Sequence, residues 1–448
     1  MNINRPLLER NVPRYTSYPT APHFHEGVAG PELAVWLGEL EPNATLSIYL
    51  HIPFCKAMCW FCGCHTSVAN RYDLVASYVR DLMAELNLVA DALGGSGRVR
   101  HIHFGGGSPS MLKPAGIDAL AALMRERFVI EPGCEIAVEF DPRGLSPETV
   151  ADFVGLGVNR ASLGLQDINP VVQQAINRIQ PPESNHRAVA MLRDAGVCAF
   201  NLDLIYGLPY RDEEAIAATV AHACELAPDR IALFGYAHVP QIKRHQQLIP
   251  SEALPGAEMR LAQEALAAKL LEAAGYRRIG LDHFARSDDP MAVAMDEGTL
   301  QRNFRGYTID PAAVLIGQGA SAIGSLPQGY VQNFADVPSW RDAVRRGELP
   351  VRRGAALAGD DRLRRDIINR LMCDLEVDLA VLQQQHGIDA DLTVSVERLA
   401  ELENAGICEI EGDSVRVAEE SRPYVRLVAA AFDAYLGDNN QGRHSRAV

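Results

Sequence analysis

Three cysteines stand in one short stretch of the chain, HIPFCKAMCWFC, where Cys55, Cys59 and Cys62 are separated by three and then two residues. This spacing lets one tight loop wrap a face of a cubic iron–sulfur cluster. A [4Fe–4S] cluster normally takes four thiolates. Three ligands would leave one iron open for a reactant, as catalytic metal sites keep a free position. The spacing therefore predicts a cluster that takes part in chemistry.

Structural zinc is the alternative, with Cys64 or His65 as the fourth ligand. Only Gly63 separates Cys62 from Cys64, which is tighter than the usual zinc spacing, and no second pair of cysteines or histidines completes a zinc module. Disulfides are a further alternative. The chain has 9 cysteines, an odd number, which argues against a disulfide framework and favours a reducing cytoplasm.

The longer stretch YLHIPFCKAMCWFCGC resembles the cluster loop of the radical S-adenosylmethionine (SAM) superfamily, in which an aromatic residue, here Phe61, precedes the last ligand. Within that superfamily, Tyr49 and Cys64 make the stretch similar to the oxygen-independent coproporphyrinogen III oxidases. Further segments carry the same resemblance over most of the chain: PRYTSYPTA near the N-terminus, HFGGGSPS (103–110), VNRASLGLQD (158–167), NLDLIYGLP (201–209) and NFRGYT (303–308).

Short β-rich runs alternate with amphipathic helical patterns from about residue 45 to residue 325. This order predicts parallel strands, because each helical crossover must traverse the sheet. The alternation fits either a flat doubly wound sheet or a barrel, and the resemblance implies an α/β fold with a partial (β/α)6 barrel. The predicted strands are 45–51, 99–104, 135–140, 159–164, 199–205 and 230–236, and the predicted helices include 72–93, 212–226 and 257–275.

The chemistry-bearing residues fall at one rim of this barrel. Reactive groups of parallel barrels lie at the C-terminal ends of the strands. The cysteine loop follows the first predicted strand, the glycine run 105–107 follows the second, and Glu139 ends the third. Gln166 follows the fourth strand, and Asp203 lies near the end of the fifth. We therefore expect a single active site at this rim.

The resemblance implies two SAM molecules at this site. The first would contact Tyr49, Gly106, Glu139 and Ile323, and the second Phe61, Gly107, Ser108, Gln166, Arg178, Asp203 and Ala237. Glycines let a backbone approach a ligand closely, although such runs also form plain turns. Arg178 suits a carboxylate, but the Ile179 that follows it departs from the acidic residue expected in relatives. Cys64 is either a catalytic group or a bystander thiol.

Residues 326–448 are predicted to form a mostly helical C-terminal domain, with helices at 361–375, 378–386, 392–404 and 422–437 and a β-hairpin in ICEIEGDSVRVA. This order is typical of a winged helix, which raises DNA binding as an alternative. The candidate recognition region carries five acids (Asp389, Asp391, Glu397, Glu401 and Glu403) against Arg398. Phosphate binding needs the opposite sign, so we interpret the domain as a cap over the barrel. Residues 1–44 are expected to pack near the active site.

The composition limits the partners of the chain. Its formal net charge of −15 over 448 residues repels nucleic acid and anionic membranes. The N-terminus lacks the apolar core of a secretory signal, and no apolar run is long enough to span a bilayer. These features predict a cytoplasmic protein, and nothing in the sequence suggests an obligate partner, so a monomer is expected.

The resemblance implies anaerobic oxidative decarboxylation of two propionates of coproporphyrinogen III to vinyl groups, giving protoporphyrinogen IX in haem biosynthesis through a 5′-deoxyadenosyl radical. It also implies an electron donor of the flavodoxin or ferredoxin type. An acidic protein must gather cations locally for such a substrate. The candidates are Arg14, Lys243, Arg244, Arg302 and Arg305. The alternatives on the same scaffold are a haem chaperone, whose relatives usually lack the Cys64 position and the RYTSYPT run, and a radical SAM enzyme that modifies haem.

Overall fold

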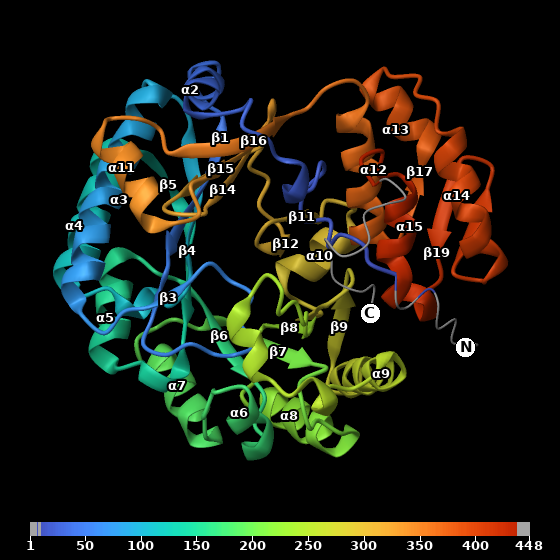
Figure 1. The fold of residues 1–448 in the computed structure, drawn as a ribbon, viewed down its shortest axis with the longest axis horizontal. Coiled ribbons are helices and arrows are strands. Elements are labelled where there is room, and N and C mark those ends of the chain that lie inside the picture. Colours follow the sequence, from blue (N-terminus) through green and yellow to red (C-terminus); the bar gives the residue numbers. More distant parts are fainter. Residues whose placement is uncertain (1–6, 8–9, 437–448) are drawn as a thin grey trace.

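A sheet of twelve strands forms the body of the protein (Figure 1). The computed structural model describes residue 7 and residues 10–436. Predictions for residues 1–6, 8–9 and 437–448, in the N-terminal segment and the C-terminal domain, lie outside the described residues. Six consecutive strands of the sheet are parallel, at the positions that the sequence predicts. They are β1 (Thr45–Ile52), β4 (Arg98–Gly106), β5 (Val129–Phe140), β6 (Arg160–Gln166), β7 (Ala199–Tyr206) and β8 (Arg230–Gly235).

The two edges of this sheet do not pair with each other within the described residues, so the barrel is open. A seventh parallel strand, β13 (Val314–Gln318), lies beside β1, and antiparallel strands extend both edges. These strands are β14 (Ile323–Leu326), β15 (Gly329–Asn333) and β16 (Val351–Ala356) at one edge, and β10 (His283–Arg286) and β9 (Tyr276–Ile279) at the other. The partial (β/α)6 barrel of the predicted α/β fold class is confirmed.

The alternation of side chains along β4 shows how the sequence builds the two faces of the sheet. Ile102 and Phe104 are 1% and 0% exposed and belong to the apolar core under the helices. His101 and His103 point to the opposite face, where they approach Glu135 and Glu139. The face toward the helices is therefore apolar, whereas the barrel interior is polar and charged.

Helices cover the outer face of the parallel strands (Figure 1). Several begin with proline after a capping side chain, a combination typical of helix N-termini; Ser146 and Asn169 are two such caps. The helices of this layer are α3 (Tyr72–Leu93), α4 (Pro114–Arg127), α5 (Pro147–Leu156), α6 (Pro170–Ala175), α7 (Pro182–Asp194), α8 (Glu213–Glu225) and α9 (Ala257–Ala273). Smaller elements elsewhere are α2 (Gly30–Gly38), α10 (Pro290–Asp296), α11 (Val337–Arg345), β11 (Gln301–Asn303) and β12 (Gly306–Thr308). Among the described residues, no helix combines the length and the apolar character needed to cross a membrane.

The last part of the chain forms a mostly helical unit beside the barrel, drawn in red in Figure 1. A three-stranded antiparallel sheet includes the predicted hairpin and a further strand that the sequence analysis missed, β17. The elements are α12 (Asp361–Asp374), β17 (Glu376–Asp378), α13 (Leu379–His386), α14 (Thr393–Asn404), β18 (Cys408–Glu411), β19 (Ser414–Val417) and α15 (Val425–Ala431). β17 has only three residues, too few to show an alternating pattern.

The last predicted helix, 422–437, is wrong in its bounds. Its first turn is a 3₁₀ helix, η6 (Glu419–Tyr424), and α15 follows only from Val425 to Ala431. Pro423 lies inside η6 and has no backbone N–H to donate. The chain leaves the helix before Asp433, whose carboxylate accepts a hydrogen bond from Tyr15 Oη at 3.1 Å.

The N-terminal segment joins the core of this C-terminal unit. Val12, Tyr15 and Tyr18 are buried in one apolar cluster with residues of α12 and α15. The division of the chain at residues 44 and 325 stays a prediction. The main sheet continues past residue 325 through β15 and β16, and β16 also bridges to His25.

A buried carboxylate connects α3 with the strands at the edge of the barrel. Glu85 is 1% exposed and accepts hydrogen bonds from the amide of Gly319 (2.7 Å), from Trp340 Nε1 (2.9 Å) and from Asn333 Nδ2 (2.6 Å). Burial raises the pKa of Glu85 to about 7, against the opposing effect of these three donors. The folded protein therefore holds a proton that the unfolded chain releases near pH 4.5.

Replacing Glu85→Gln is expected to flatten the pH dependence of stability. The contribution of a carboxyl group with a raised pKa is present at low pH and is lost as the pH rises through the folded value. As the pH rises from 6 to 8, the loss of the Glu85 proton should lower the unfolding free energy of the wild type by about 1 kcal/mol. Urea denaturation of both proteins at the two pH values measures the difference. If the unfolding free energy changed equally with pH in the wild type and the variant, Glu85 would not have a raised pKa.

Candidate active site

The cysteine loop follows β1 at the C-terminal edge of the parallel strands. Two short parallel strands, β2 (Phe54–Cys55) and β3 (Ser67–Val68), close the base of the loop. His51, at the end of β1, contacts the carbonyl of His65 through Nε2 at 2.8 Å. The loop is therefore fixed to the sheet at both of its ends.

The middle of the loop is held from two further sides. The amide of Trp60 donates to the carbonyl of Ile176, in the segment after β6, at 2.9 Å. On the other side, His245 Nε2 lies 2.7 Å from the carbonyl of Cys62. Because backbone groups of the loop are tied to three separate parts of the barrel, the thiols are positioned before any ligand binds.

Two guanidinium groups lie against the second cysteine. Cys59 Sγ accepts hydrogen bonds from Arg143 Nη2 (3.3 Å) and Arg178 Nη1 (3.5 Å). Cys55 lies in a different environment, where burial raises the pKa of its thiol to about 11. Metal coordination would have to displace that proton.

Cys62 and Cys64 form a hydrogen-bonded pair of thiols. The hydrogen bond from Cys64 lowers the pKa of Cys62 to about 6, although burial opposes this shift. The same hydrogen bond raises the pKa of Cys64. The pair therefore favours a thiolate at Cys62 and leaves the proton on Cys64.

The glycine run after β4 lies against the cysteine loop. A Cβ atom on Gly107 would come within 2.6 Å of the carbonyl oxygen of Phe54, and one on Gly105 within 2.6 Å of Glu139 Oε1. Gly106 has a φ of +109°, and a Cβ there would come within 2.6 Å of the His51 ring. At each of the three positions a side chain would therefore clash with other atoms of the protein.

Glu139 has partners on both oxygens. Its Oε1 lies 2.9 Å from His103 Nε2, and Oε2 accepts from the amide of Gly106 at 3.1 Å. Burial raises the pKa of Glu139, but the hydrogen bonds from His103 and Gly106 outweigh it and hold the pKa below its ordinary value. Tyr49 stacks on His103 with ring centroids 5.8 Å apart. The structure thus brings Tyr49, Gly106 and Glu139 together at the ends of β1, β4 and β5.

Gln166, Arg178 and Asp203 form a second group next to Cys59. Arg178 Nη2 donates to the carbonyl of Gly164 at 2.6 Å, and a Cβ on Gly164 would come within 2.7 Å of Gln166 Nε2. Burial raises the pKa of Asp203 to about 7, with a further contribution from Glu139. Gln166 has a φ of +67°, which is unusual for a residue with a side chain. Such backbone strain is concentrated at functional sites.

The remaining predicted contacts lie around these two groups. The carbonyls of Phe61 and Ala237 both accept from Gln246 Nε2, at 3.0 and 3.2 Å, so that the loop and the end of β8 are held together. Ser108 is buried, and its Oγ lies 2.7 Å from Ser110 Oγ. Ile323 lies on β14, two strands away from Tyr49.

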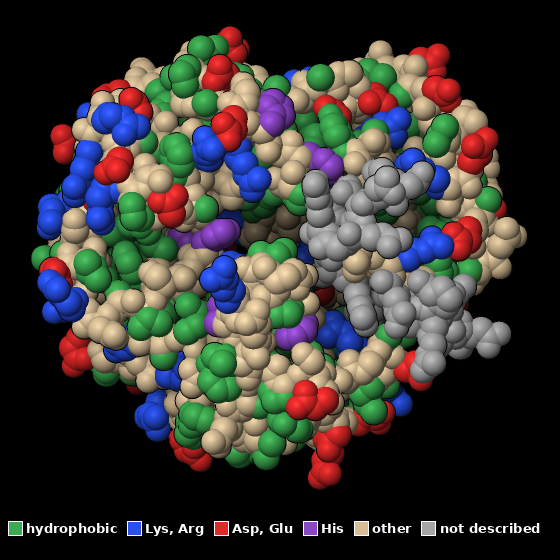
Figure 2. All heavy atoms as spheres, viewed as in Figure 1, with side chains coloured by type: hydrophobic (Ala, Val, Ile, Leu, Met, Phe, Trp, Pro, Cys, Tyr) green, Lys and Arg blue, Asp and Glu red, His purple; other side chains and the backbone are tan. Residues whose placement is uncertain are grey.

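A cavity of about 420 Å³ opens beyond the ends of β7 and β8. Arginines predominate among its charged groups. It is lined by Arg14, Arg260, Arg302 and Arg426 and by the acids Asp282 and Glu264. Ala237 also lines it, so this cavity adjoins the predicted SAM contacts. Figure 2 shows a hollow near the middle of one face, with histidine and cationic side chains on its rim.

Three of the five cations proposed for substrate binding do not line this cavity. Lys243 Nζ donates instead to the carbonyl of Cys64 at 3.0 Å. Arg305 Nη2 forms an ion pair with the buried Asp310 at 2.8 Å. Arg244 begins the short helix η4 (Arg244–Leu248), which packs beside the cysteine loop through its Gln246 and His245.

Sequence reasoning missed two residues of the site. His103 contacts Glu139, and Arg143 contacts both Cys59 and Asp141. His103 stands in the inward register of β4, and Arg143 comes four residues after Glu139, just past the end of β5. A rule that lists every polar side chain within a few residues of a strand's C-terminal end would have found both.

The fold and this site define a radical SAM protein. The Radical SAM superfamily model matches residues 49–223, and the HemN C-terminal domain model matches residues 357–424. The chain belongs to the oxygen-independent coproporphyrinogen III oxidase family. A member from Bradyrhizobium diazoefficiens is 50% identical over 441 residues, which cover 98% of each chain. One from Pseudomonas aeruginosa is 37% identical over 445 residues, with 97% of this chain and 96% of the relative covered.

A solved structure supports the same assignment. The coproporphyrinogen III oxidase HemN from Escherichia coli, described as a radical SAM enzyme, matches with a TM-score of 0.90 and 36% sequence identity. The match covers 94% of this chain and 98% of that chain. Radical SAM proteins use a [4Fe–4S] cluster and SAM. The residues present here fit both groups: three thiols share one loop with guanidiniums beside Cys59, and the buried atoms Gln166 Oε1 and Arg178 Nε have no protein partner.

Replacing Gly107→Ala is expected to reduce cluster loading at least severalfold, because the new methyl group would push the backbone of Phe54 and the cysteine loop away. Iron and sulfide content after anaerobic reconstitution, together with the visible absorption, measures the effect. Gly155→Ala in α5 is the matched control, since a Cβ there meets no atom within 4 Å. Wild-type iron content in the Gly107 variant would show that this close approach does not position the loop.

Proposed function

We propose that this protein catalyses the oxygen-independent oxidative decarboxylation of coproporphyrinogen III to protoporphyrinogen IX in haem biosynthesis. One observation carries the proposal. The three-cysteine loop and an arginine-lined cavity share one rim of a chain that is 50% identical to an oxygen-independent coproporphyrinogen III oxidase over 98% of both lengths. Two propionates of the substrate would lose CO₂ and become vinyl groups.

Cys55, Cys59 and Cys62 would hold the [4Fe–4S] cluster. When bound, the cluster and SAM supply a reactive carbon radical that can take a hydrogen atom from the substrate. The protein's task is to position these groups and to keep water away. Arg143 and Arg178 donate to Cys59 Sγ and would hold that ligand in place.

Two SAM molecules fit the two groups of predicted contacts. Tyr49, Gly106, Glu139 and Ile323 would serve the first, and Phe61, Gly107, Ser108, Gln166, Arg178, Asp203 and Ala237 the second. The unpartnered Gln166 Oε1 and Arg178 Nε support a polar ligand at the second position. The amide of Gly107 already donates to Ile52 at 2.8 Å, so its contribution would be the space it leaves.

The arginine-lined cavity would bind substrate propionates. Guanidinium groups pair with carboxylates through two parallel hydrogen bonds. Burial lowers the pKa of Arg14, although Asp282 opposes this shift. An incoming carboxylate would therefore find a cation whose charged form gains from a negative partner. Arg302 lies 3.7 Å from Asp282 and above the Tyr307 ring at 4.5 Å, which fixes the direction of its planar head.

Cys64 is the remaining candidate for a catalytic group. It keeps its proton because it donates to Cys62. A protonated thiol beside the cluster loop can donate a hydrogen bond or a hydrogen atom, and this is the role we propose. The cysteine content supports a reducing, cytoplasmic setting. We also propose that the protein is a monomer and receives electrons from a donor of the flavodoxin or ferredoxin type.

The activity itself tests the proposal. Anaerobically reconstituted protein, supplied with SAM, a strong reductant and coproporphyrinogen III, should release CO₂ and form a two-vinyl product that chromatography separates from the substrate. SAM cleavage with an unchanged tetrapyrrole would reject the proposal. Haem binding without decarboxylation would favour the chaperone alternative, and consumption of haem would favour a haem-modifying enzyme.

The variant Cys62→Ala is expected to lose the cluster absorption and all SAM cleavage, because the remaining two thiols do not hold the cluster. Cys198→Ala provides the matched control, since Cys198 is exposed and lies outside the loop. Electron paramagnetic resonance of the reduced proteins distinguishes them. A normal spectrum from the Cys62 variant would overturn the ligand assignment.

The variant Arg14→Ala is expected to raise the KM for coproporphyrinogen III about 10- to 100-fold, the effect of removing one charge-assisted hydrogen bond. SAM cleavage in the absence of substrate should not change. Arg10→Ala is the control, because Arg10 lies in the same segment but pairs with Glu401 at the surface. Kinetic measurements under anaerobic conditions give the KM and the rate of SAM cleavage without substrate. Equal KM values for the two variants would exclude Arg14 from substrate binding.

A further inference from the structure

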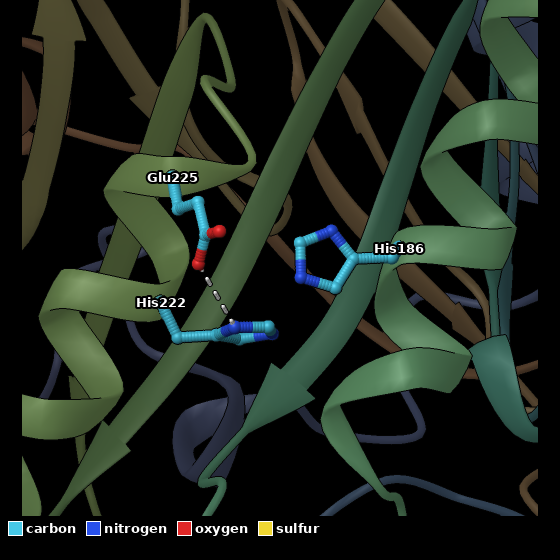
Figure 3. Close-up of side chains that lie close together, drawn as sticks. All are labelled: His186, His222 and Glu225. Carbon is cyan, nitrogen blue, oxygen red and sulfur yellow. Dashed lines mark ion pairs between the residues drawn. The ribbon is translucent and has the colours of Figure 1, made fainter.

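Two histidines and a glutamate meet on the outer helical layer of the barrel, outside the site described above (Figure 3). His186 comes from α7, and His222 and Glu225 come from α8. One ligand atom from each residue lies within 4.8 Å of the other two. In the part of the chain that the structure describes, no other three such side chains are grouped in this way.

The spacing of the three side chains leaves room for an ion. His222 and Glu225 are three residues apart on α8 and so share one face of the helix. His222 Nδ1 lies 3.9 Å from Glu225 Oε2, too far for a hydrogen bond. The rings of His186 and His222 are 5.1 Å apart and nearly perpendicular. Ligand atoms around a shared ion at about 2.0–2.2 Å would need to close by only about 1 Å.

The surroundings keep His222 in the form that binds metal. Its side chain is 7% exposed, whereas that of Glu225 is 67% exposed and His186 is also at the surface. Burial, followed by the proximity of His186, lowers the pKa of His222. Neutral imidazole is the metal-binding form. The exposed pair provides a path for an ion from solvent.

A further residue orients the buried ring. Asn185 Nδ2 lies 3.2 Å from His222 Nε2, and Gln180 Nε2 donates to Asn185 Oδ1 at 2.6 Å. Histidines that bind metal through one nitrogen are held by a polar partner on the other. Gln180 holds Asn185 Oδ1, so Asn185 presents its Nδ2–H₂ group to Nε2; an ion at Nδ1 would require the Asn185 and Gln180 amides to turn together, so that Asn185 Oδ1 accepts from Nε2–H. Gln180 also donates to the carbonyl of Gly164, so the chain of contacts starts at β6.

We propose that His186, His222 and Glu225 bind one divalent transition-metal ion of the class that prefers imidazole, such as Zn²⁺, with water in the remaining positions. Two imidazoles and one carboxylate are a common donor set for this class. The ion bridges α7 and α8, the helices that cover the strands carrying Gln166 and Asp203. The proposal does not depend on the catalytic function.

Zn²⁺ binding to the anaerobically loaded holoprotein tests this site, because the loop cysteines are then occupied. After chelator treatment and desalting, titration against a chromophoric zinc chelator should reveal one equivalent that is bound at least 10-fold more weakly in His186→Ala. Glu225→Gln should weaken the same equivalent. Both residues are exposed, so neither change endangers folding.

His386→Ala is the matched control, since His386 also faces a carboxylate, Asp366 at 2.9 Å, but without a third ligand among the described residues. Zn²⁺ should also raise the Tm of the wild type and of the His386 variant, and not that of the His186 variant, because the ion binds the folded state only. Equal affinity and stoichiometry in the wild type and the His186 variant, or no binding by the wild type at micromolar Zn²⁺, would overturn the proposal.

Discussion

The close approach of two backbones decides the geometry of the active site. The glycine run at the end of β4 and the start of the cysteine loop after β1 lie in direct contact, with the amide of Ser108 donating to the carbonyl of Phe54 at 2.8 Å. A side chain on Gly107 would separate them. Because the same two strands carry Tyr49 and His103, this contact sets the positions of the thiols and of the Glu139 carboxylate relative to each other.

Arginines are concentrated at the candidate site although the chain as a whole is acidic. The chain has 57 acidic residues against 42 lysines and arginines. Arg143 and Arg178 nevertheless lie beside Cys59, and four arginines line the cavity at the ends of β7 and β8. Field strength in a cleft depends on the nearest charges and on the low dielectric of its walls, so the cavity can attract anions although the net charge of the chain is negative.

The sequence was sufficient to predict the strands and helices with strong periodicity and the polar groups at the ends of the strands. All six predicted parallel strands lie where the alternation placed them, whereas the seventh, β13, was not predicted; Glu139, Gln166 and Asp203 lie at one rim. Other features depend on partners that are distant in sequence. Lys243 was expected to bind substrate, and the fold places its Nζ where it donates a hydrogen bond to the carbonyl of Cys64 at 3.0 Å. Arg143 carries no motif and becomes important only because the fold places it 3.3 Å from Cys59 Sγ.

The N-terminal segment, the barrel and the C-terminal unit all contribute arginines to the cavity. Arg14 comes from residues before β1, Arg302 from β11, and Arg426 from α15. Arg426 Nε donates to the carbonyl of Pro13 at 2.9 Å, and Arg302 Nη2 donates to the carbonyl of Arg14 at 3.5 Å. Each arginine thus helps to position the segment that carries another. A displacement of the N-terminal segment would move Arg14 and remove one acceptor from each of the other two arginines, so the arrangement of charges in the cavity is coupled to the packing of the two ends of the chain.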